Sequence, residues 1–147
     1  MPGIIVGVDG HSQRALEWGA REAAIRHTPL TVLTVCHTMA GLGGGPLLYP
    51  VTLSGLQGAR QAAQAQADGA IERLGAQRPP KVTVRAVEGV PAQELARAAD
   101  SAEMLIVGFL GVGGLTRLMM GSVSSQVTRL ANCPVVVIPS DPSDERG

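Results

Sequence analysis

Five short segments rich in aliphatic and β-branched residues constrain the fold of this chain more than any other feature. They are Ile4–Val8, Leu30–Cys36, Val82–Val87, Met104–Val107 and Val135–Ile138. A continuous apolar run such as Ile4–Val8 is typical of a strand that is buried on both faces, as in a parallel sheet, and the β-branched residues of Leu30–Cys36 also favour a strand. The run Val82–Val87 alternates instead between apolar and polar residues, which is typical of an edge strand.

Helical patterns lie between these runs. The first begins at Ser12, a residue that favours the N-cap position, and a longer one covers Thr52–Gly75. Pro91 opens a third, where its missing N–H costs little, and the last covers Ser122–Ala131. Alternation of strands and helices requires right-handed crossovers and a parallel sheet with helices on both of its faces. We therefore predict an α/β fold with an open, five-stranded parallel sheet.

The size and charge of the chain exclude several classes of protein. Its 147 residues are enough for one domain with a sizeable core, and no second domain is predicted. The formal net charge is +0, so the electrostatic footprint of a protein that binds nucleic acid or an anionic membrane is missing. The N-terminus has neither a basic segment nor a long hydrophobic stretch, so we expect a cytoplasmic protein. Cys36 and Cys133 lack the spacing of metal ligands and are expected to be reduced thiols.

A glycine-rich segment follows the run Met104–Val107 and precedes the last helical pattern. Its glycines include Gly108, Gly111 and Gly121, and Ser122 begins the helix. Backbone N–H groups in such a loop and at a helix N-terminus bind anions, and a serine hydroxyl adds a further donor. Two interpretations stay open from these residues alone. One is a phosphate-binding loop, and the other is a flexible connection that leads to a serine-capped helix.

The same residues carry a resemblance to a known family. Gly108, Gly111, Gly121 and Ser122 match the pattern Gly-x2-Gly-x9-Gly-Ser/Thr of the nucleotide-binding branch of the universal stress protein family. The likeness extends over Ile4–Pro139 and includes the sequences VGVDG near the start and CPVVV near the end. The family implies a Rossmann-like fold, in which the sheet has the strand order 3-2-1-4-5.

The resemblance also implies the extent of the domain and its assembly. A universal stress protein-like domain is expected over residues 1–140, followed by a polar, disordered tail over residues 141–147. The family implies a homodimer in which the strand Val135–Ile138 pairs antiparallel with its copy, and an apolar strand edge of this kind invites a partner. The implied role is that of a stress-response regulatory protein. It acts as a nucleotide-dependent switch on a protein partner that the sequence does not identify.

The implied ligand is ATP, with Mg²⁺ as a companion ion. Asp9 is expected near the ribose and phosphates or as a ligand of the magnesium ion, and the backbone near Val35 is expected to contact the adenine. Gly108 and Gly111 are expected to flank the ribose and phosphates. The expected phosphate cradle consists of Gly121, Ser122, Val123 and Ser124.

Some features depart from the family pattern and keep an alternative function open. Phe109 and Leu110 replace a polar pair, which removes a hydroxyl and a cation from the mouth of the pocket. The first loop, from Asp9 to Ser12, is shorter than is common in the family. The alternative is a homodimeric interaction module of the same fold, with a degenerate pocket that holds no nucleotide.

Motifs of efficient ATP-hydrolysing enzymes do not occur in the sequence. There is no Gly-x-x-x-x-Gly-Lys-Ser/Thr segment, and the only lysine, Lys81, lies far from the glycine-rich segment in the chain. Asp9 and His11 are the candidates for a base that activates water, and both are weak ones. The sequence therefore predicts a binding protein with no catalytic residue and at most slow ATP hydrolysis.

Overall fold

The structure is a computed structural model that describes residues 3–9, 12–37, 53–109 and 122–139. Within these residues it contains the five predicted strands and the four predicted helices. In chain order they are β1 (Ile4–Gly7), α1 (Gln13–Arg26), β2 (Leu30–His37), α2 (Leu53–Leu74), β3 (Val82–Gly89), α3 (Pro91–Ala98), β4 (Met104–Phe109), α5 (Ser122–Leu130) and β5 (Val135–Pro139). Gly111, Gly121 and the expected tail over residues 141–147 lie outside the described residues.

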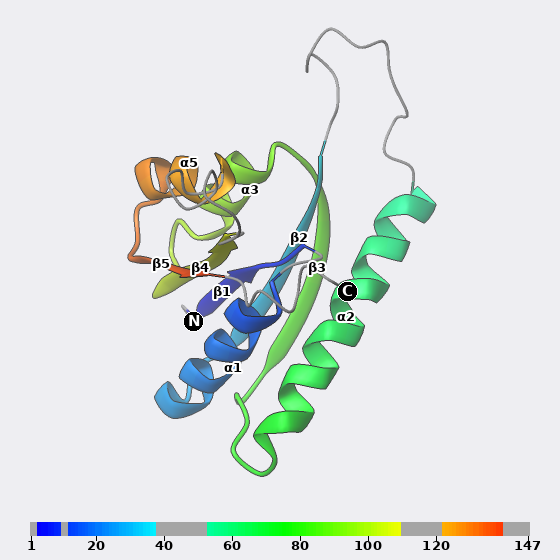
Figure 1. Ribbon diagram of the computed structural model, residues 1–147, viewed down its shortest axis with the longest axis vertical. Coiled ribbons are helices and arrows are strands. Elements are labelled where there is room, and N and C mark those ends of the chain that lie inside the picture. The colour runs from blue at the N-terminus through cyan, green and yellow to red at the C-terminus, as the bar shows by residue number, and fades with distance from the viewer. Residues whose placement is uncertain (1–2, 10–11, 38–52, 110–121, 140–147) are drawn as a thin grey trace, which may run out of the picture.

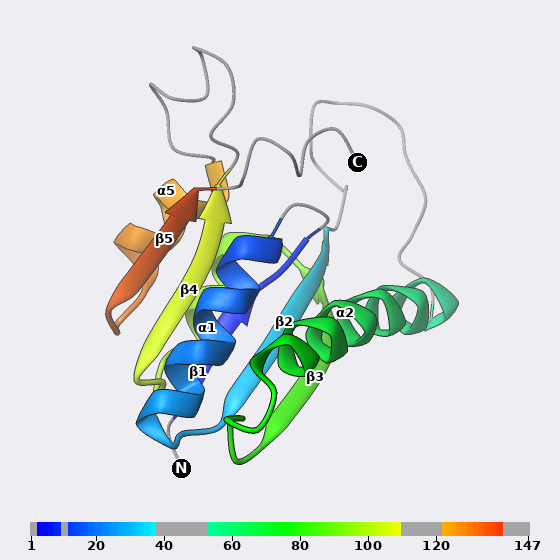
Figure 2. The same cartoon turned by 60° about the horizontal axis from the view of Figure 1, so that its bottom comes forward.

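The strands form one parallel sheet in the order β3-β2-β1-β4-β5, which confirms the order implied by the family. β1 occupies the centre, where Ile4 pairs with Leu30 of β2 on one side and with Met104 of β4 on the other. Helices α1 and α2 cover one face of the sheet, and α3 and α5 cover the other (Figure 1 and Figure 2). The predicted α/β fold with helices on both faces is therefore confirmed.

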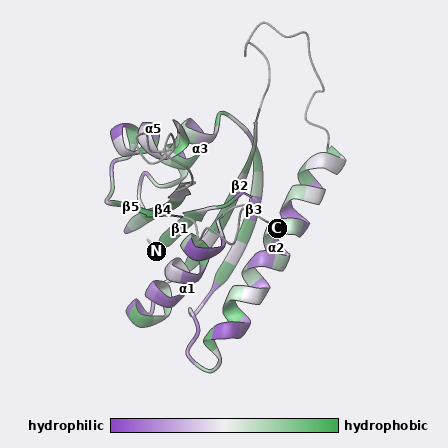
Figure 3. Ribbon diagram, in the orientation of Figure 1, coloured by the Kyte–Doolittle hydropathy of each residue, from purple (hydrophilic) through white to green (hydrophobic). Residues whose placement is uncertain are grey.

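Burial of β1 on both faces explains its continuous aliphatic sequence. Ile4 and Val6 pack against α1 and α2, and both have an exposed fraction of 0%. Ile5 packs on the opposite face together with Leu105, under α3 and α5. In Figure 3 the central strands are coloured as apolar, whereas the helices alternate between apolar and polar residues. None of the helices within the described ranges has both the length and the apolar character that crossing a membrane requires.

Helix α1 ends at Arg26, just before Thr28-Pro29, a pair that favours a helix end. The structure shows how the last turn closes, because His27 adopts the left-handed conformation, with a φ of 54°. The N–H groups of His27 and Thr28 donate to the carbonyl oxygens of Ala24 and Ala23, at 3.2 and 3.0 Å. These bonds satisfy carbonyl groups of the last turn. The helix therefore ends before the proline is reached.

Gly19 lies where α1 packs closely on the sheet, and its substitution tests this contact. A Cβ atom at Gly19 would lie 2.5 Å from Cγ2 of Val6 and 3.0 Å from Cδ1 of Ile106. Branching at Cβ makes Val6 stiff, so Gly19→Ala is expected to destabilise the protein by about 1–3 kcal/mol, although alanine favours a helix. Urea denaturation measures the change in the free energy of unfolding.

Gly58 in α2 is the matched control for this substitution. Among the described residues, and apart from its chain neighbours and the backbone of α2 itself, no atom lies within 4 Å of a Cβ built at Gly58, so Gly58→Ala meets open space. This variant is expected to stabilise the protein by about 0.5–1 kcal/mol through helix propensity alone. Equal changes in the free energy of unfolding for the two variants would contradict the close packing at Gly19.

Candidate functional site

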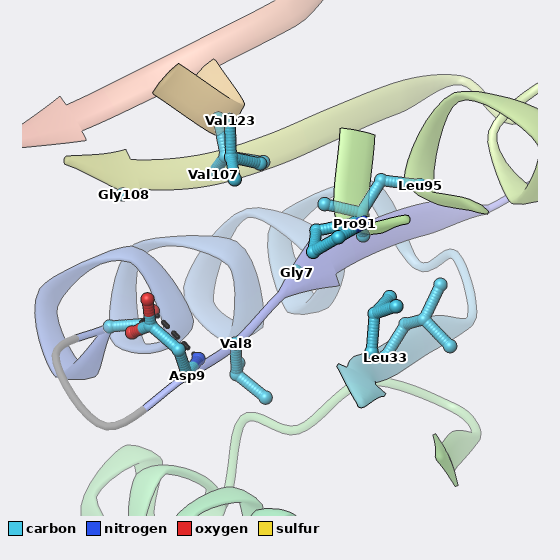
Figure 4. A pocket seen from close by; sticks show the side chains of 11 residues that line it. Gly7, Val8, Asp9, Leu33, Pro91, Leu95, Val107, Gly108 and Val123 are labelled. Carbon is cyan, nitrogen blue, oxygen red and sulfur yellow. Dashed lines mark hydrogen bonds between the residues drawn. The ribbon is translucent and has the colours of Figure 1, made fainter. Parts of the chain in front are cut away.

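A cavity of about 130 Å³ lies at the carboxyl ends of β1 and β4, where the strand order reverses. Connections from the two sides of this point run over opposite faces of the sheet, so a crevice forms between them. The end of β1 and the residues after it contribute Gly7, Val8 and Asp9, and β4 contributes Val107 and Gly108. The other walls come from β2, α3 and α5, through Leu33, Val35, Pro91, Leu95 and Val123 (Figure 4).

The walls of the cavity are mostly aliphatic, and the polar side chains among the described lining residues are those of Asp9 and Ser12, which follow β1 in the chain. Leu33 and Leu95 are buried, with exposed fractions of 1% and 5%. Among the described residues that line the cavity, Asp9 carries the only charge, and this residue is exposed. Pockets for drug-sized ligands have volumes of about 300–1,000 Å³. The described part of the cavity lies below this range and has room for one ring of a ligand.

Asp9 and Ser12 are joined by two hydrogen bonds that use the same hydroxyl group. Oγ of Ser12 donates to Oδ1 of Asp9 at 2.8 Å and accepts the backbone N–H of Asp9 at 3.1 Å. Ser12 occupies the predicted N-cap position of α1, but its side chain makes no cap hydrogen bond, which corrects its expected role. A side-chain cap contributes about 1 kcal/mol, and α1 forgoes it. Nε2 of Gln66 in α2 also donates to the carbonyl oxygen of Asp9, at 3.4 Å.

Gly7 shapes the cavity because α3 approaches it closely. A Cβ atom at Gly7 would lie 2.8 Å from Cδ2 of Leu95, which itself lines the cavity. The sequence places Gly7 on the same face of β1 as Ile5, but no signal in the sequence pairs it with Leu95. Contacts between distant residues leave no signal in the sequence, so most of the residues that line the cavity were not predicted as site residues. They are Gly7, Val8, Ser12, Leu33, Pro91, Leu95 and Val107.

The sequence-predicted site residues divide into three groups. Those that line the cavity are Asp9, Val35, Gly108 and Val123. Ser124 is 1% exposed and is not among the lining residues, and Ser122 begins α5. Gly111 and Gly121 lie outside the described residues. The roles of all these residues toward a nucleotide stay predictions.

The described part of the chain shows no cluster of side chains for metal binding. No group of three or more His, Cys, Asp or Glu residues there is arranged to hold a metal ion. The role of Asp9 as a magnesium ligand stays a prediction. Cys36 and Cys133 are free thiols that do not line the cavity. Burial raises the pKa of the Cys133 thiol, and the charge of Asp100 adds to the rise, against a hydrogen bond with the backbone of Leu105.

The fold and the cavity together define the class of this protein. An open parallel sheet with a cavity at its point of strand reversal is typical of doubly wound α/β proteins, which bind ligands at this place. Residues 2–139 match the family described as the universal stress protein family. The chain belongs to this family, which confirms the resemblance that the glycine–serine pattern carries.

Curated relatives occur in mycobacteria. A universal stress protein of Mycobacterium tuberculosis is 39% identical over 143 residues, which are 95% of this chain and 48% of the relative. A universal stress protein of Mycolicibacterium smegmatis is 32% identical over 142 residues, which are again 95% of this chain and 48% of the relative. The chain thus spans about half the length of these curated relatives.

Solved structures share the fold at lower sequence identity. The universal stress protein UspA of Lactobacillus plantarum aligns with a TM-score of 0.71 and 23% identity, over 93% of this chain and 97% of the other. A universal stress protein in complex with cAMP aligns with a TM-score of 0.66 and 23% identity, over 95% and 98% of the two chains. One from Archaeoglobus fulgidus in complex with dAMP aligns with a TM-score of 0.60 and 22% identity, over 94% and 98%. At these identities the likeness shows the fold alone.

The contact between Gly7 and Leu95 is tested by a double-mutant cycle. Gly7→Ala is expected to destabilise the protein by about 1–3 kcal/mol, because the new methyl group overlaps Leu95. Leu95→Ala removes buried methyl groups and is expected to cost about 2–5 kcal/mol. In the double variant the alanine at position 95 leaves room for the methyl group of the alanine at position 7. The loss in the free energy of unfolding is therefore expected to be about 1 kcal/mol smaller than the sum of the losses in the two single variants. Urea denaturation of the four proteins measures the coupling, and additive effects would contradict the contact.

Proposed function

We propose that this protein binds ATP together with Mg²⁺ and acts as a nucleotide-dependent switch in a cytoplasmic stress response. The observation that carries the proposal is that Asp9 and Gly108 line one cavity at the point of strand reversal. Asp9 contributes a carboxylate, and Gly108 leads into the glycine-rich segment that ends at helix α5. Open α/β sheets bind their ligands at this place.

The chemistry of the cavity fits the base and the ribose of a nucleotide. Leu33, Val35 and Leu95 offer aliphatic surface to a purine ring, and in a cavity of about 130 Å³ the phosphates would lie outside. The carboxylate of Asp9 accepts hydrogen bonds, as the ribose hydroxyl groups require. The start of α5 would then receive the phosphates, since backbone N–H groups and the helix dipole favour an anion there. An oxygen ligand such as Asp9 also suits Mg²⁺.

Structures of the same fold support a nucleotide as the class of ligand. One universal stress protein was solved in complex with cAMP and another in complex with dAMP. Both ligands contain an adenine, a sugar and a phosphate, and these parts suit the aliphatic walls, Asp9 and the start of α5. ATP is the finer proposal. It rests on the match of the glycine–serine pattern to the nucleotide-binding branch of the family.

A second candidate function is a homodimeric interaction module that holds no nucleotide. Phe109 and Leu110 favour it, because they stand where the family pattern has a polar pair. For the nucleotide-binding protein we propose no catalysis beyond slow ATP hydrolysis, and in either case the regulatory partner stays unidentified. Nucleotide binding by the wild-type protein separates the two candidates.

The phosphate cradle is tested by Gly121→Val and Ser122→Ala. Gly121→Val is expected to abolish ATP binding, because a β-branched side chain restricts the backbone and blocks the approach of the phosphates. Ser122→Ala is expected to weaken binding about tenfold, which corresponds to about 1.4 kcal/mol. Isothermal titration calorimetry with ATP and Mg²⁺ measures both effects.

The matched control for the cradle is Gly69→Val on α2. Apart from its chain neighbours and the backbone of α2 itself, the described atom nearest to a Cβ at Gly69 is Nη2 of Arg73, 3.8 Å away, so this variant is expected to bind ATP like the wild type. If the wild type gives no heat in the titration and no thermal shift with millimolar ATP, nucleotide binding is refuted. The interaction module would then be the remaining candidate.

The proposal extends to a homodimer that forms through β5. This strand lies at an edge of the sheet, and its residues Val135–Ile138 are aliphatic and half-buried. The edge of such a strand exposes unpaired backbone groups beside apolar side chains. A second copy of the chain that pairs with β5 would cover both.

Lysine substitutions in β5 test this dimer. Val136→Lys or Val137→Lys is expected to shift the protein toward monomer, because a lysine in an edge strand opposes pairing with another strand. Val87→Lys, in the edge strand β3 on the other side of the sheet, is the matched control and is expected to leave the dimer intact. Multi-angle light scattering measures the molar mass of each variant. A monomeric wild type at micromolar concentration would exclude the dimer.

A further inference from the structure

We infer that Ser12 is a positioning residue that holds the carboxylate of Asp9 in place for the ligand. The inference deepens the proposed function and rests on it, because Asp9 is the charged side chain among the described residues that line the cavity. Ser12 lines the same cavity and is 6% exposed, whereas Asp9 is exposed. A buried hydroxyl group thus anchors an exposed carboxylate beside the cavity, and Figure 4 marks the hydrogen bonding of Asp9 with dashes.

Both hydrogen-bonding functions of the Ser12 hydroxyl are directed to Asp9. Oγ donates to Oδ1 at 2.8 Å, which orients the carboxylate, and it accepts the N–H of Asp9 at 3.1 Å, which orients the backbone. An aspartate that is held at its backbone and at its side chain has little rotamer freedom before a ligand arrives. The entropy of ordering Asp9 is therefore lost during folding rather than during binding.

The hydrogen bonds between Ser12 and Asp9 leave the start of α1 without a stabilising side-chain cap. Ser12 stands at the N-cap without a side-chain cap bond, and the first turn of α1 contains no acidic residue that would compensate the helix dipole. A serine that served only the helix would direct its hydroxyl to the N–H groups of the first turn. Ser12 instead bonds a residue three positions earlier in the chain. Ser12 lines the cavity and departs from the usual capping role of a serine at a helix start, and such departures point to a role in the site.

A double-mutant cycle separates positioning from a purely structural role. Ser12→Ala is expected to weaken the binding of ATP with Mg²⁺ about tenfold, because it removes a hydrogen bond to a charged group. In the Asp9→Ala background the same change is expected to have no further effect, since no carboxylate is left to position. Ser12→Thr keeps the hydroxyl group and is expected to restore most of the affinity. Ser101→Ala, at an exposed serine that does not line the cavity, is the matched control and is expected to bind like the wild type.

A second measurement on the same variants needs no nucleotide. Hydrogen exchange at the amide of Asp9, followed by NMR, is expected to be faster in Ser12→Ala, because the N–H loses its acceptor. Unchanged exchange at Asp9, or equal losses of affinity from Ser12→Ala with and without Asp9, would overturn the positioning role while nucleotide binding stands. Absence of ATP binding by the wild type would instead overturn the proposed function. The two failures are therefore distinguishable.

Discussion

Close packing on both sides of β1 is the constraint on which the rest of the structure depends. On one face Gly19 brings α1 against Val6, and on the other Gly7 allows Leu95 of α3 to approach the strand. One glycine belongs to a helix and the other to the strand, and each leaves room for a side chain of the opposite element, Leu95 at Gly7 and Val6 at Gly19. Neither helix can move toward the sheet or tilt over it without a collision. Helices α1 and α3 are therefore held against opposite faces of β1, whose carboxyl end borders the cavity at one end of the sheet.

The cavity at this end continues the hydrophobic core rather than interrupting it. Leu33, Leu95 and Val107 belong both to the core between the sheet and helices α3 and α5 and to the wall of the cavity. A ring that fills the cavity would extend this core, with a gain of about 25 cal/mol for each Å² of apolar surface that it buries. Ligand binding and folding stability are linked for this reason. Any ligand that binds only the folded state raises the free energy of unfolding.

Local features of the fold were predictable from the sequence, whereas contacts between distant residues were not. Gly75 adopts a φ of 71° after α2, and Pro91 begins α3, as their residue types predict. The sequence predicts Ser12 as the N-cap of α1, whereas its hydroxyl group bonds Asp9 instead. A serine hydroxyl can serve either purpose, so the residue type alone does not distinguish them. The packing of Leu95 against Gly7 joins positions far apart in the chain, and no local pattern reports it. The glycine-rich segment and Ser122 carry a physical signal of their own, because such a loop and a helix N-terminus bind anions, whereas the expected contacts of Asp9 and Val35 with parts of ATP rest on the family pattern.

The proposed site has two parts, the aliphatic cavity and the start of α5. The two candidate functions, a nucleotide switch and a nucleotide-free module, differ in whether the second part binds phosphates. Aliphatic walls hold any flat apolar ring, so in the proposed function the selection of a nucleotide would depend on Asp9 and on donors near the start of α5. Each hydrogen bond to a charged group contributes about 1.5–3 kcal/mol, so the expected loss of a polar pair at Phe109 and Leu110 would lower the affinity for a nucleotide. The core and the β5 edge do not depend on those groups. A nucleotide switch and a nucleotide-free module therefore differ by a few side chains in one loop, and the site rather than the fold decides the function.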